Sequence, residues 1–176
     1  GQAAYRSVAA IHAQADQARA QVKDFASTAL IGIMRSTPIG TLCACYWVGD
    51  GAVAVYRQGA QVLILGAADA GEYAGQTRFL DANAVTAEVI AARTQFALVA
   101  DITAFILMTD GVSDPKFDTE ANLKSLPLWD ELWAQLGPLA QAGDGAEQLL
   151  AWLDFWSPGN HDDRTLLMAV PIAAQE

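Results

Sequence analysis

The chain has 176 residues, of which 53% are apolar, and this is enough for one folded domain with a substantial core. Twenty acidic against ten scattered basic residues give a net charge of −10, which argues against binding to nucleic acid or to anionic membranes. The longest apolar run, residues 96–108, is interrupted by Asp101 and is too short to span a bilayer.

The first segment predicts a helix over residues 4–24. It is rich in Ala, Gln and Arg, contains no Gly or Pro, and places Val8, Ile11, Ala15 and Val22 near one face. Before it the chain reads Gly-Gln-Ala-Ala, with neither an initiator Met nor a signal peptide. We therefore expect the native N-terminus to lie upstream of Gly1.

Residues 27–108 predict most of the β structure. A strand over 27–35 is closed by a turn at Ser36-Thr37-Pro38. Asp50-Gly51 and Gln58-Gly59 are reversal signals, and they predict an antiparallel meander of three strands at 41–48, 52–57 and 61–65. Further strands are expected at 77–80, 85–90, 97–100 and 104–108.

The two cysteines, Cys43 and Cys45, lie two positions apart in a predicted strand, so both sulfurs point to one face of the sheet. The pair lacks the further Cys or His residues that a zinc site needs. We interpret both as buried free thiols, which indicates a reducing compartment and a cytoplasmic location.

After Asp114 the apolar residues recur with the period of a helix. One stripe contains Leu128, Leu132, Leu136 and Leu139, and another contains Leu149, Leu150, Leu153 and Trp156. Residues 142–145, Ala-Gly-Asp-Gly, separate the two helices, and an apolar run at 165–170 predicts a last strand before Pro171. Four tryptophans at helical spacing are expected to pack the helices onto the sheet: Trp129, Trp133, Trp152 and Trp156. The order of elements predicts a single α+β domain over residues 1–176.

Aspartates stand at the ends of three predicted strands. Asp110 follows the run at 104–108, Asp162 and Asp163 precede the last strand, and Asp50 follows the run at 41–48. Each Asp alone is equally compatible with a turn that binds nothing. Because the three recur without a His/Cys cluster, together they favour a hard, oxygen-ligated ion, Mg²⁺ or Mn²⁺, over zinc.

Four segments resemble, in order and spacing, the motifs of bacterial type 2C serine/threonine protein phosphatases. They are STALIGIM at 27–34, YWVGDGAVAVYR at 46–57, FILMTDGVSD at 105–114 and HDDRTLLMAV at 161–170. The segment GEYAGQTRFL at 71–80 is similar to a tyrosine-containing segment of one bacterial branch. The resemblance covers about residues 26–172.

This resemblance implies an αββα sandwich, in which two antiparallel sheets are flanked by helices. It also implies a phosphorylated protein as substrate and two Mg²⁺ or Mn²⁺ ions that activate a water for attack on phosphorus. By position, Asp110 and Asp162 match the core metal ligands, and Asp50 and Asp114 match ligands of a third, weaker ion. Asp163 stands where Asn is usual.

The chain also departs from the family pattern. Gly51-Ala52 replaces the common Ser-Arg, and no DG-x-GG element, whose Asp bridges both metals in the family, precedes Tyr5. We therefore interpret the chain as the C-terminal three-quarters of the domain. We expect it to be inactive alone and to self-associate through unpaired sheet edges. The alternative is a catalytically silent module that binds a partner or transmits a signal.

Three further interpretations depend on the resemblance or on single residues. Residues 115–160 match the family's variable region beside the active site, a source of substrate specificity. His161 has two interpretations, a residue that approaches bound phosphate and an exposed loop residue. His12 is expected on a helix surface.

Overall fold

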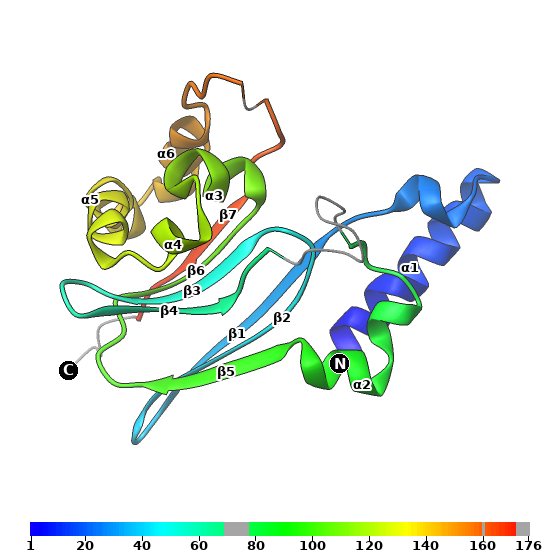
Figure 1. The fold of residues 1–176 in the computed structure, drawn as a ribbon, viewed down its shortest axis with the longest axis horizontal. Helices are drawn as coiled ribbons and strands as arrows, with labels where there is room; N and C mark the ends of the chain where they lie inside the picture. The colour runs from blue at the N-terminus through cyan, green and yellow to red at the C-terminus, as the bar shows by residue number, and fades with distance from the viewer. Residues whose placement is uncertain (69–77, 160, 172–176) are drawn as a thin grey trace.

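The computed structural model describes residues 1–68, 78–159 and 161–171. It contains two antiparallel sheets that pack face to face (Figure 1). Sheet A has the order β1-β2-β5 and contains β1 (Ala29–Thr37), β2 (Gly40–Val48) and β5 (Thr94–Val99). Sheet B has the order β4-β3-β6-β7 and contains β3 (Ala52–Arg57), β4 (Gln61–Gly66), β6 (Ala104–Met108) and β7 (Leu166–Ala169). The predicted α+β class with two antiparallel sheets is confirmed.

The helices cover the two sheets unequally (Figure 1). Sheet B carries four of them on its outer face: α3 (Asp110–Phe117), α4 (Glu120–Leu123), α5 (Leu126–Gln141) and α6 (Gly145–Leu153). Sheet A meets α1 (Gln2–Ala18) and α2 (Ala87–Ala92) only at one end. No helix in the described part of the chain is long and apolar enough to cross a bilayer.

The interior between the sheets follows from strand alternation. Val53 and Val55 of β3 and Phe105 of β6 point inward and meet Cys43 and Cys45 of β2. Both cysteines are buried and free, as predicted, and burial raises the pKa of each thiol to about 11. At neutral pH the two sulfurs therefore act as small apolar groups in the core.

A second core lies between sheet B and α5. The outer face of sheet B presents small side chains, Ala52, Ala54 and Ala104, and the indoles of Trp129 and Trp133 pack in the same cluster. The predicted packing role is confirmed for these two tryptophans, and Trp152 is partly buried against the same core. It is wrong for Trp156, which follows α6 and is 79% exposed. Leu150, placed on the predicted apolar stripe, is also exposed.

The predicted three-stranded meander is wrong at Asp50-Gly51. The chain reverses there, but β2 belongs to sheet A and β3 to sheet B, so the connection crosses between sheets instead of closing a hairpin. β2 pairs with β1 and β5, and β3 pairs with β4 and β6. A turn signal specifies that the chain reverses, whereas the pairing partner depends on strands far along the sequence.

The N-terminal helix ends earlier than predicted. Arg19 adopts a left-handed conformation with φ of 53°, and a short 3₁₀-helix follows at Val22–Phe25. The Asp24 carboxylate accepts a hydrogen bond from the Gln21 backbone N–H at 3.1 Å, so a capping interaction starts a new element inside a sequence of high helix propensity.

Residues 85–90 also differ from the prediction. The expected strand is replaced by a 3₁₀ turn at Asn83–Val85 and by α2, because the Thr86 hydroxyl caps the helix by accepting from the Val89 N–H. Residues 78–80 form no strand, and position 77, with most of the segment at 71–80, lies outside the described residues. The helices α3 and α4 were not predicted.

One polar contact ties α5 to sheet B. The buried Tyr56 hydroxyl donates to the Asp130 carboxylate at 2.5 Å, and the Gly59 N–H donates to the same oxygen at 3.0 Å. These two donors lower the pKa of Asp130. The carboxylate thus anchors α5 to the β3–β4 turn while it is ionised.

We predict that Tyr56→Phe lowers Tm at pH 7 by about 2–5 °C, because a charge-assisted hydrogen bond is lost. The folded-state pKa of Asp130 is depressed, so the stabilisation is present above its unfolded pKa and disappears as pH falls through the folded value. Thermal unfolding should show the difference between the two proteins shrinking below about pH 4.

The matched control is Tyr46→Phe. The Tyr46 hydroxyl is also buried but donates to a backbone carbonyl, that of Ala84, at 2.6 Å. Its loss should lower Tm by an amount that does not change as the pH falls from 7 to below about 4. Equal pH dependence in both variants would contradict the role of Asp130.

Candidate functional site

Three connections meet at one end of the sandwich, and each carries one of the predicted aspartates. Asp50 lies on the crossover from β2 to β3, Asp110 is the first residue of α3 after β6, and Asp162 precedes β7. Thr109 joins the last two: its N–H donates to the Thr165 carbonyl at 3.0 Å, and its hydroxyl accepts from the Thr165 N–H at 2.9 Å. These bonds hold the segments before α3 and before β7 side by side.

Two glycines allow this close approach. A Cβ on Gly51 would lie 2.6 Å from the Met108 carbonyl oxygen, and a Cβ on Gly111 would overlap the Asp163 carbonyl oxygen. A side chain at either position would push the backbones apart. The glycines after Asp50 and Asp110 therefore serve the packing of the connections against each other.

The helix α3 gives two of the carboxylates a common face. Asp110 and Asp114 are four residues apart, so they lie one turn apart on the same side of the helix. Asp110 begins the helix, where the dipole stabilises a negative charge, and its carboxylate accepts from the Gly111 N–H at 2.9 Å. Asp162 is held in a similar way by the N–H of Asp163 at 2.8 Å.

The four predicted carboxylates repel one another. Partial burial and the charge of Asp50 raise the pKa of Asp110, and the charges of Asp162 and Asp114 raise it further. The hydrogen bond from the Gly111 N–H lowers this pKa, but the net shift is upward. Partial burial and Asp50 also raise the pKa of Asp114, as do Asp162 and Asp118. The structure therefore brings all four predicted positions into one region of negative potential, in which a divalent cation would relieve the repulsion.

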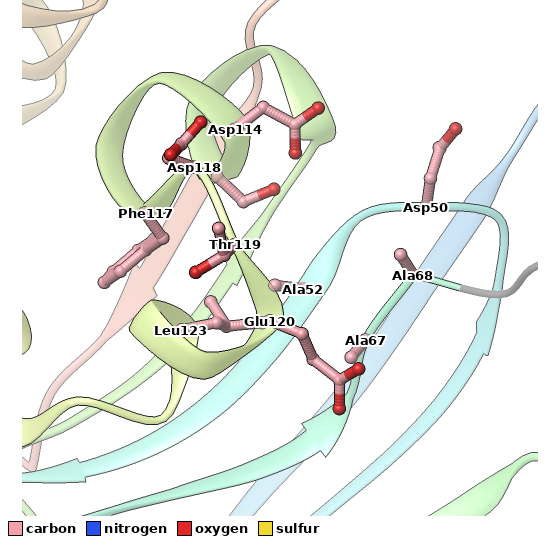
Figure 2. Close-up of a pocket in the computed structure, with 11 residues that line it drawn as sticks. Asp50, Ala52, Ala67, Ala68, Asp114, Phe117, Asp118, Thr119, Glu120 and Leu123 are labelled. Atoms are coloured by element: carbon pink, nitrogen blue, oxygen red, sulfur yellow. The ribbon is translucent and has the colours of Figure 1, made fainter. Parts of the chain in front are cut away.

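The carboxylates do not converge into a finished ligand set. Within residues 1–68, 78–159 and 161–171, no three His, Cys, Asp or Glu side chains are placed to hold one ion. Figure 2 shows Asp50 and Asp114 on opposite sides of a pocket. The donors nevertheless fit a hard cation, because they are carboxylate oxygens without His or Cys and their charges are only partly balanced.

The pocket beside the carboxylates has a volume of about 240 Å³. Ala52, Phe117 and Leu123 supply apolar walls, and Asp118 and Glu120 add acidic groups (Figure 2). These last two residues were not predicted as part of the site, because α3 and α4 were not predicted. The spacing of Asp114 and Asp118, four residues apart, was the available signal.

Arg164 makes contacts near the site that were not predicted. Its guanidinium donates to the carbonyls of Leu153 at 2.9 Å and Phe155 at 2.5 Å, and it stacks on the Phe155 ring at 4.0 Å. Lys116 of α3 lies over the same ring at 3.9 Å. Arg164 thus fixes the segment that carries Asp162 against the C-terminal end of α6.

The remaining predicted positions lie at the surface. His161 is exposed, and its ring packs edge-on against Trp156 with centroids 6.1 Å apart. His12 is exposed on α1, as expected. Asp163 is exposed, and the structure uses its backbone carbonyl, which accepts from the Thr109 hydroxyl at 3.3 Å.

Comparison with known protein families assigns the chain to one of them. The family profile described as Protein phosphatase 2C matches residues 2–154, which is most of the chain. The chain therefore belongs to the protein phosphatase 2C family, whose members are generally metal-dependent. No curated protein matches the sequence significantly.

Among solved structures, the chain is similar to a mutant form of a bacterial serine phosphatase. The identity is 15% and the TM-score is 0.46, with 82% of this chain and 53% of the other chain covered. The chain thus spans about half the length of that protein.

We predict that Gly111→Ala lowers both stability and divalent-metal affinity, since the new methyl group must displace the backbone at Asp163. Gly143→Ala is the matched control, because a Cβ there meets nothing within 4 Å. Thermal unfolding and calorimetric titration with Mn²⁺ should separate the two variants, with Tm lower by about 2–8 °C for Gly111→Ala only. Equal behaviour would show that the close approach is unimportant.

A second prediction concerns the carboxylate repulsion. Without divalent ions, Asp110→Asn and Asp114→Asn should each raise Tm by about 2 °C, because each removes one of the mutually repelling charges. Mn²⁺ should raise the Tm of the unaltered chain, and the increase should be smaller for either variant. Asp16→Asn, on the exposed side of α1, is the control and should change neither value. An unchanged or lower Tm in both Asp110→Asn and Asp114→Asn would argue against the repulsion.

Proposed function

We propose that the protein hydrolyses phosphoserine and phosphothreonine esters in proteins with the help of Mg²⁺ or Mn²⁺. The observation that carries this proposal is the gathering of Asp50, Asp110, Asp114 and Asp162 at one end of the sandwich, where burial and the neighbouring carboxylates raise the pKa values of Asp110 and Asp114. Family membership supports the same chemistry. Isolated surface turns would not produce this accumulation of negative charge.

In this proposal, Asp110 and Asp162 hold the core ions, and Asp50 with Asp114 holds a weaker one. When bound, divalent ions lower the pKa of water and neutralise phosphate charge. The protein's own contribution is position and charge. Thr109 and Gly111 set the spacing between the segments that carry Asp110 and Asp162, and Arg164 holds the second segment in place.

The pocket between α3, α4 and sheet B is proposed to receive residues that flank the phosphorylated side chain. It opens beside Asp50 and Asp114, and its outer part is formed by residues 117–123, inside the region expected to determine specificity. Its apolar walls and acidic groups suit a flanking side chain that has an aliphatic stem and a positive charge.

A silent phosphatase-like module is the second candidate. One observation favours it: in the described part of the chain, no three potential ligands are already arranged around one point. Phosphate release from phosphoserine, phosphothreonine and phosphotyrosine peptides, with and without Mn²⁺, distinguishes the two. The full-length gene product should release phosphate from the first two peptides only when Mn²⁺ is present. Absent release would support the silent module, and Mn²⁺-independent release would contradict the metal-dependent mechanism.

The aspartates should rank in a definite order in that assay. Asp110→Asn and Asp162→Asn should reduce activity by roughly two orders of magnitude or more, because each removes a charge that holds a core ion. Asp50→Asn should be milder at saturating Mn²⁺. Asp163→Asn, which places the family's usual residue there, should be nearly silent and serves as the control. Inactivation by Asp163→Asn but not by Asp162→Asn would shift the proposed ligand by one position.

A further inference from the structure

The outer face of sheet A carries an apolar patch, which we call the sheet A patch and define as Ile33, Leu42, Ala44, Phe96 and Leu98. The strand register places Ile33, Ala44 and Phe96 in one row across the three strands, and Leu42 and Leu98 in the next. Phe96 is 72% exposed, Ile33 61% and Leu98 48%. Three large apolar side chains are therefore clustered in solvent on one face.

The pattern of apolar residues along these strands indicates that the outer face of sheet A is covered. An antiparallel sheet with one solvated face carries polar residues on that face. In the middle of β2 and β5 the residues that point inward, Cys43 and Ala97, are apolar, and so are the outward-pointing residues at positions 42, 44, 96 and 98. The α1 cluster buries the end of this face near Tyr46 but does not include the patch. Figure 1 shows both α1 and α2 at that one end.

Charge favours a second copy of the chain as the occupant. The chain has a net charge of −10, so most pairs of surfaces on two copies repel each other. The sheet A patch contains no acidic residue, and its charged neighbour on β1 is Arg35, opposite Leu42. Two copies can meet at this face without bringing acidic residues of the patch together, which favours an interface between identical, negatively charged chains.

Shape and area agree with a two-fold arrangement. The small side chain of Ala44 lies between Ile33 and Phe96, so the middle strand has a local depression at this position. Two identical faces of this kind can interdigitate, with the Phe96 ring of each copy over the depression at Ala44 of the other. The three exposed side chains present on the order of 300–400 Å² per copy, which suits a weak, concentration-dependent dimer rather than an obligate one.

We propose that the protein forms a two-fold dimer in solution through the sheet A patch. The contact is face to face, in contrast to the pairing of open sheet edges expected from the sequence. It lies on the opposite side of the sandwich from the helices α3–α6, and its formation is independent of the proposed phosphatase activity.

The test is sedimentation equilibrium of the full 176-residue chain over a range of concentrations. A dimer should form at concentrations on the order of 100 µM, and both Phe96→Glu and Leu98→Glu should weaken it at least tenfold. Leu150→Glu is the matched control: Leu150 is 71% exposed, like Phe96, but lies on α6. It should leave the dimer unchanged.

Near-UV circular dichroism of each variant checks that the fold is retained, which is expected because the substituted side chains are exposed. A monomer at all concentrations up to about 1 mM, a dimer that resists both patch substitutions, or a dimer that Leu150→Glu disrupts equally would overturn the proposal. Growth into larger assemblies would also overturn it, because a two-fold contact closes on itself.

Discussion

The arrangement of the acidic end depends on how closely three backbone connections approach around Thr109. Its hydroxyl and amide join the start of α3 to the segment before β7, and Gly51 and Gly111 remove the side chains that would separate these connections. Asp50 and Asp110 are adjacent to one of these residues, and Asp114 lies one turn from Asp110. Asp162 precedes Asp163, whose carbonyl accepts from the Thr109 hydroxyl. The carboxylates are near each other because the backbones are.

This closeness has an energetic cost that the rest of the fold must offset. Burial and like charge raise the pKa values of Asp110 and Asp114, so the acidic end opposes folding at neutral pH. The opposing stabilisation comes from elsewhere. It includes the tryptophans of α5 packed on the alanines of sheet B and the closely packed interior between the sheets. A destabilised site supported by a well-packed scaffold is common where function requires concentrated charge.

Local patterns in the sequence predicted much of this structure. They failed where strand pairing or side-chain contacts depend on residues far apart in the sequence. The strands at β3 and β6 agree with the predicted ranges, because alternation and turn residues are local signals. The assignment of β2 and β3 to different sheets could not be predicted, since it depends on pairing with β5 and β6. The same limit applied to the site: the Asp positions carried a signal, whereas the contacts of Arg164 to Leu153 and Phe155 exist only after folding.

The chain order of the site has a consequence for how it assembles. Thr109 and Thr165 are 56 positions apart, and four helices are formed by the residues between them. Contacts between distant positions form late in folding, because the loop between them must be closed first. We therefore expect the acidic end to be completed last, when β7 docks on β6. The same strand edge should then be the first to open in native-state hydrogen exchange.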